Sequence, residues 1–109
     1  MASEREDLVF KAEVKRREAK EDRAASEAKR EEARLLLSQI NDSKGRIVTW
    51  KKMKTCRGAF DVLLVAEEER VRTLEDGRRA ILAEADAITK RAYKAEQAAL
   101  QLDERASKL

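Results

Sequence analysis

The sequence contains no proline and no histidine, and only three glycines and one cysteine among its 109 residues. Because proline and glycine are the residues that most often interrupt helices, long stretches of this backbone have no obligatory break. Without histidine, and with a single cysteine, the side chains that usually carry acid–base, nucleophilic or metal chemistry are nearly missing. We therefore expect no enzymatic activity, no catalytic residue, no cofactor and no metal site.

Aromatic residues make up only 4% of the chain, too few for the core of an ordinary compact domain. Alanine, glutamate, lysine, arginine and leucine dominate instead, which is the composition of long helices. The longest apolar run, residues 62–66, is far shorter than the ~20 residues that a membrane-spanning helix needs. We expect one all-α domain over residues 1–109 with no membrane span.

The single cysteine, Cys56, cannot form a disulfide within the chain, which favours a reducing compartment such as the cytoplasm. The last three residues, Ser107, Lys108 and Leu109, resemble a peroxisomal import signal. A peroxisomal location is therefore the alternative if these residues form the native C-terminus.

One apolar ladder organises the second half of the sequence. It follows alternating steps of three and four residues, and fifteen of its eighteen positions are apolar. This spacing keeps one face of a helix against a partner helix, as in a coiled coil. We call these positions the apolar ladder: Trp50, Met53, Arg57, Phe60, Leu64, Glu67, Val71, Leu74, Arg78, Ile81, Ala85, Ile88, Ala92, Ala95, Ala99, Leu102, Ala106 and Leu109.

A first helix is predicted over about residues 3–40, starting at a capping box formed by Ser3 and Glu6. It has a weaker apolar face, on Leu8, Ala12, Ala19, Ala33, Leu36 and Ile40. Residues 41–45 combine Asn, Asp, Ser and Gly, which favour turns, so the sequence predicts the connection there. The second helix is predicted to run from about 46 to 109 without a break, because the ladder keeps its phase across Gly77. A bend is allowed at that residue, since glycine is a common site of helix kinks.

This arrangement is an elongated antiparallel helical hairpin with a long second helix, and a three-helix bundle broken at Gly77 is the alternative. The two predicted helices are unequal, so the first would pair with the second only to about residue 80. The ladder from Ile81 onward would then lack a partner within the chain. We therefore expect a protein partner or a homo-oligomer to cover it.

The leading functional hypothesis is a non-enzymatic structural or adaptor coiled coil that binds other proteins and acts in an assembly. The expected partner-binding residues are the larger members of the ladder: Val71, Leu74, Ile81, Ile88 and Leu102.

The alternative hypothesis is a module that binds nucleic acid or another anionic surface. Residues 41–60 hold six basic residues and one acidic residue, whereas the rest of the chain is close to balanced. Its basic patch spans residues 44–57, and a basic tip within it comprises Trp50, Lys51, Lys52, Lys54 and Arg57. The balanced charge elsewhere makes nucleic acid the less favoured partner.

Overall fold

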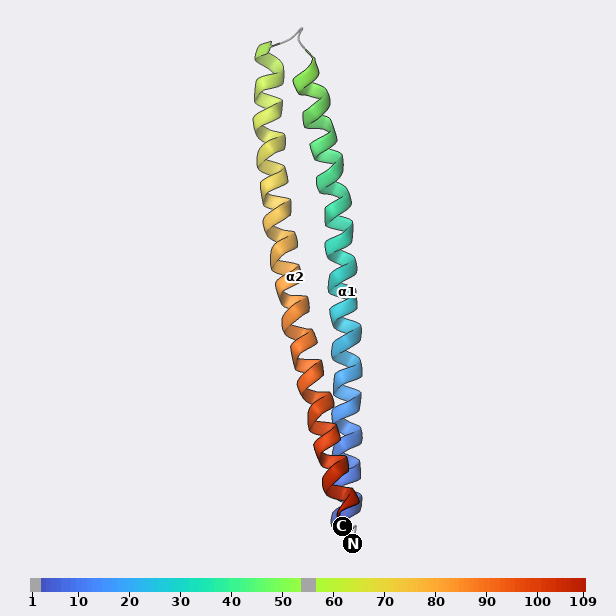
Figure 1. Ribbon diagram of the computed structural model, residues 1–109. Helices are drawn as coiled ribbons and strands as arrows, with labels where there is room; N and C mark the ends of the chain where they lie inside the picture. Colours follow the sequence, from blue (N-terminus) through green and yellow to red (C-terminus); the bar gives the residue numbers. More distant parts are fainter. Residues whose placement is uncertain (1–2, 54–56) are drawn as a thin grey trace. The chain divides into compact units, whose positions relative to one another are not determined.

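The computed structural model describes residues 3–53 and 57–109, and the side chains of 57–60 are not part of this description. Two long helices account for nearly all of it: α1, Glu4–Lys52, and α2, Arg57–Ser107 (Figure 1). No strand occurs among the described residues, which confirms the all-α prediction of a helical hairpin with a long second helix. Neither helix has, within the described part, a stretch long and apolar enough to cross a membrane.

The start of α1 follows the predicted capping box. The backbone N–H of Glu6 donates to the hydroxyl of Ser3 at 3.1 Å, satisfying a donor that the first turn would leave free. Glu4, Glu6 and Asp7 in the first turn, and Lys51 and Lys52 in the last, also match the polarity of the helix dipole.

The predicted turn at residues 41–45 is wrong, because α1 continues through this segment to Lys52. Gly45 is helical, with no positive φ, and costs roughly 1 kcal/mol relative to alanine. Packing outweighs this cost: Ile40 and Ser43 are fully buried, and Ile47 is half-buried on the same face. The helices are instead separated by residues 53–56, of which the structure describes only Met53.

The second helix runs without interruption through Gly77, as the phase of the apolar ladder predicted. Gly77 has no positive φ, and a β-carbon placed on it would meet no atom within 4 Å. The three-helix alternative, which needed a turn at this residue, is therefore wrong.

Contacts divide the chain into two units, Met1–Lys29 with Glu84–Leu109, and Arg30–Ala83. In the first unit, Lys29 pairs with Glu84 at 3.2 Å, and Arg16 pairs with Asp103. The residue nearer the start of α1 pairs with the residue nearer the end of α2, so the two segments are antiparallel. Its buried residues are Leu8, Ala12, Ala19, Ser26, Ala85, Ala92, Ala99 and Ala106.

The second unit is also an antiparallel pair. Lys51 pairs with Glu68 at 3.6 Å, and Arg78 reaches the backbone of Ala33 at the other end of the unit. Its buried residues are Ala33, Ile40, Ser43 and Val71.

Small side chains recur every seven residues in the buried seam of each helix. In α2 these are Ala85, Ala92, Ala99 and Ala106, none more than 4% exposed. In α1 they are Ala12, Ala19, Ser26 and Ala33. A seam lined by small residues lets two helices approach closely. Each heptad therefore buries little apolar surface, and the seam leaves little room for larger side chains.

Candidate protein-binding surfaces

The five predicted partner-binding residues lie in the seam between the two helices. Val71 is buried, and the other four are half-buried on the face of α2 that meets α1 (Leu74, Ile81, Ile88, Leu102). Between Leu64 and Ala106, every position of the apolar ladder is buried or half-buried. The periodicity therefore predicted the buried face correctly, but this face packs against the other helix of the same chain.

The expectation that the ladder from Ile81 onward lacks an internal partner is wrong. Ala85, Ala92 and Ala99 are at most 2% exposed, inside the unit that also contains the first part of α1. The error follows from the misplaced turn. Because α1 extends to Lys52, the two helices are of nearly equal length, with 49 and 51 residues. Two members placed at the ends of the ladder, Met53 and Leu109, are exposed.

A buried polar contact interrupts the alanine seam of the first unit. The hydroxyl oxygens of Ser26 and Thr89 lie 2.7 Å apart, and both reach the backbone carbonyl of Ala85, at 3.1 and 2.9 Å. Ser26 is only 3% exposed. A buried hydroxyl that finds its partner in one alignment alone favours that register over a slipped one.

A second polar contact lies in the seam of the other unit. Arg46 donates two hydrogen bonds to one carboxylate oxygen of Glu67, at 2.9 and 2.6 Å, and a third to the buried hydroxyl of Ser43 at 3.0 Å. Hydrogen bonds from Ser43, which has the larger effect, and from Arg46 lower the pKa of the Glu67 carboxyl below its usual value. Glu67 is thus an ionised member of the ladder that is held by polar partners on α1.

Charged residues also line one edge of each unit, basic on α1 and acidic on α2. In the first unit, Arg16 pairs with Asp103, and seven residues further along α1 Arg23 pairs with Glu96 through both carboxylate oxygens. The hydrogen bonds from Arg23 lower the pKa of Glu96, and those to Glu96 raise the pKa of Arg23.

The second unit repeats the pattern, with Lys44–Glu75 at 3.0 Å and Lys51–Glu68 at 3.6 Å. None of these pairs between the helices was predicted from the sequence. A seven-residue repeat of one sign on each helix is the signal that could have found them.

The basic tip is only partly described. Lys51 is paired with Glu68, Lys52 is exposed at the end of α1, and Trp50 is half-buried. Lys54 and the side chain of Arg57 lie outside the described residues. Within residues 44–57, Lys44 and Arg46 also have carboxylate partners on α2, so acidic residues of the same unit offset much of the local positive charge.

An apolar groove lies on α2 in the second unit, away from the seam. Val62, Val65 and Ala66 line it, with Asp61 and Glu69 at its ends, and its volume is about 430 Å³. Val62 is 72% exposed and Val65 56% exposed. Their spacing of three and four residues places them on one face of the helix. We call this surface the valine groove.

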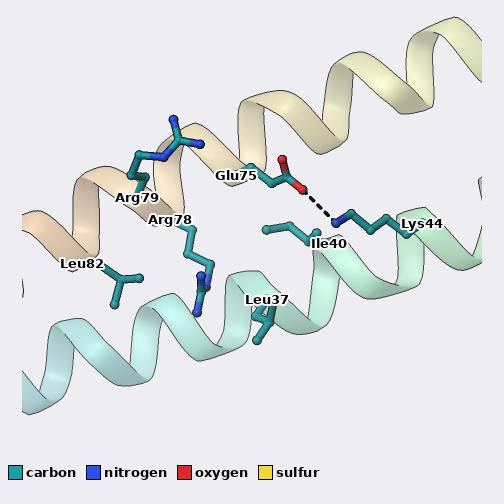
Figure 2. A pocket seen from close by; sticks show the side chains of 7 residues that line it. All are labelled: Leu37, Ile40, Lys44, Glu75, Arg78, Arg79 and Leu82. Carbon is teal, nitrogen blue, oxygen red and sulfur yellow. Dashed lines mark ion pairs between the residues drawn. The ribbon is translucent and has the colours of Figure 1, made fainter.

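A cavity of about 310 Å³ opens between the helices of the same unit. Leu37 and Ile40 of α1 and Leu82 of α2 supply its apolar wall, and Arg78 extends from α2 across the gap toward α1 (Figure 2). The Lys44–Glu75 ion pair closes one end. We call it the arginine cavity.

Among the described residues, no group of three or more histidine, cysteine, aspartate or glutamate side chains is placed to hold a metal ion. No protein-family model, curated protein or solved structure matches this chain.

Proposed function

We propose that this protein is a non-enzymatic structural or adaptor hairpin that binds a protein partner through the valine groove. The observation that carries the proposal is the exposure of Val62 and Val65 on a helix whose other apolar face is already covered. Because the seam residues between Leu64 and Ala106 face α1, a partner is best accommodated by apolar side chains that point outward.

The charges around the groove favour one kind of occupant. Asp61 and Glu69 stand at its two ends. A second copy of this chain would bring the same two carboxylates against them, in either orientation, and like charges repel. An amphipathic helix with leucine-sized side chains flanked by lysine or arginine is complementary in both respects.

The alternative, binding of an anionic surface through the basic patch of residues 44–57, has weaker support. Lys44, Arg46 and Lys51 all have carboxylate partners within the unit, so these cations are partly neutralised. Nucleic-acid binding would also show a steep loss of affinity with added salt, which an apolar groove does not require.

A peptide titration tests the proposal. The probe is a fluorescein-labelled amphipathic helical peptide with leucines at i, i+3, i+4 and i+7 and lysines beside them. A matched peptide carries glutamates in place of the lysines. We expect the lysine peptide to bind more tightly, and the double variant Val62→Ser, Val65→Ser to lose this binding.

The control variant is Tyr93→Ser with Leu100→Ser, which removes two exposed apolar side chains outside the groove. It should bind like the parent. Equal binding of both peptides, or unchanged binding by the groove variant, would refute the proposal. A mass that rises with concentration and falls in the groove variant would assign the groove to a second copy instead.

A further inference from the structure

We infer that the arginine cavity is a second recognition site, which takes a large apolar side chain and an adjacent carboxylate from a partner peptide. The inference does not depend on the valine groove, since the two surfaces share no residue. The charged edge of the second unit is interrupted at this cavity. Leu37 lies seven residues before Lys44, and Leu82 lies seven residues after Glu75. A leucine therefore stands on each helix where the pattern would place a charge.

The size of the cavity suits one side chain. At about 310 Å³ it lies at the lower limit of pockets that hold small molecules. Its apolar wall is formed by Leu37, Ile40 and Leu82, and Leu37 remains 37% exposed at the opening. Partially open pockets of this kind anchor single aromatic residues in protein interfaces.

The polar part of the cavity selects a negative charge. Lys44 is bound to Glu75 at 3.0 Å, so these two charges offset each other. Arg78 and Arg79 add two further cations to the lining, and Asp76 on the same helix offsets part of the charge of Arg79. The cavity thus has an excess of positive charge beside an apolar wall, and arginine is the residue best shaped to bind a carboxylate.

The two arginines are placed differently. The Nε of Arg78 donates to the carbonyl oxygen of Ala33 at 3.3 Å, which holds the side chain across the gap and uses one of its five N–H donors. Arg79 is 78% exposed at the side chain and lies 3.3 Å from Asp76 on its own helix. Arg78 is thereby fixed, and Arg79 is free to move toward a ligand, because an exposed pair at this spacing is weak.

A purely structural account of Arg78 is that its bond to Ala33 fixes the register of the helices. This account gives no role to Arg79. Arg79→Gln therefore separates the two accounts, because the exposed side chain contributes little to the hairpin. Arg72→Gln is the matched control, one heptad earlier on the same exposed face and outside the cavity.

The probes are two blocked dipeptides, acetyl-Phe-Glu-amide and acetyl-Phe-Gln-amide, titrated into the isotopically labelled full chain. We expect the glutamate dipeptide to shift the resonances of Leu37, Arg78 and Leu82, and to bind about fivefold more tightly than the glutamine dipeptide. Arg79→Gln should weaken its binding by about threefold, with Arg72→Gln unchanged. Binding should also weaken as salt is added.

Equal affinities for the two dipeptides would overturn the inference, as would shifts that map outside the cavity or an Arg79→Gln variant that binds like the parent. Leu82→Ala provides a second check. It should reduce binding of the glutamate dipeptide while circular dichroism stays helical, and retention of full affinity would count against the cavity.

Discussion

The hydroxyl oxygens of Ser26 and Thr89 lie 2.7 Å apart in a seam that is otherwise lined mainly by alanine. This contact joins the first helix to the second across 63 positions of sequence. Because the buried hydroxyl of Ser26 also reaches the carbonyl of Ala85 on the other helix, a one-heptad slip would leave this hydroxyl without either partner. The register of this unit is therefore set by polar contacts as well as by the apolar ladder.

The alanine seam should not tolerate a larger side chain. Ala92 is 0% exposed, so Ala92→Leu must separate the helices or distort its neighbours. We expect it to lower the free energy of unfolding by about 1–3 kcal/mol. Ala87→Leu, on the exposed side of the same helix, should change it by no more than about 0.5 kcal/mol. Urea unfolding of both variants beside the parent checks this, and equal costs would contradict the seam.

Gly45 and Gly77 should each accept alanine. At Gly45 and Gly77 an added β-carbon meets nothing within 4 Å, and neither residue has a positive φ. Each Gly→Ala substitution should therefore raise the free energy of unfolding by about 0.5–1 kcal/mol. The Gly45 variant is the more informative, because a turn at 41–45 would make alanine unfavourable there. A lower melting temperature for Gly45→Ala than for the parent would instead support a turn at residues 41–45.

Acid should weaken the hairpin through Glu67 and Glu96. The pKa of each carboxyl lies below its usual value in the folded chain, because hydrogen bonds from Ser43 and Arg46 (to Glu67) and from Arg23 (to Glu96) favour the ionised form. Their contribution is thus fully present above the unfolded pKa and is lost as pH falls through the lower folded value. Glu67→Gln with Glu96→Gln should be less stable than the parent at pH 7. The difference should shrink below about pH 4.5, and a difference independent of pH would refute the assignment.

The charged edges should couple energetically across the helices. Arg16→Asp and Asp103→Arg each place like charges together, and the double variant restores an opposite pair. Both side chains are partly exposed, so we expect a coupling free energy of only about 0.2–1 kcal/mol. A double-mutant cycle in low salt measures it, and additive single effects would show that the pairing is not formed.

The seam could be predicted from the sequence because its apolar positions recur at heptad spacing in a chain that is 43% charged. The sequence did not predict the end of α1. The turn propensity of residues 41–45 is overridden by packing: Ile40 and Ile47 on either side of the segment, and Ser43 within it, lie in the seam only if α1 continues. Local propensity could not reveal this, because the competing term is tertiary packing.

The two candidate surfaces could not be read from the sequence for a related reason. The arginine cavity needs Leu37 and Leu82 on facing helices, a relation fixed only once the pairing is known. The valine groove was visible only as the longest apolar run, and its outward direction depends on which face of α2 meets α1.

The central claim is that the chain covers its own apolar ladder between Leu64 and Ala106, and a disulfide trap tests it most directly. In a Cys56→Ser background, Ser26→Cys and Thr89→Cys place two thiols where two hydroxyls now touch. Under mild oxidation we predict a bond within one chain, with a monomeric mass by light scattering and faster migration on a non-reducing gel. A bond that forms only between chains, or no bond at all, would contradict the account. It would favour the hypothesis that another chain covers the ladder.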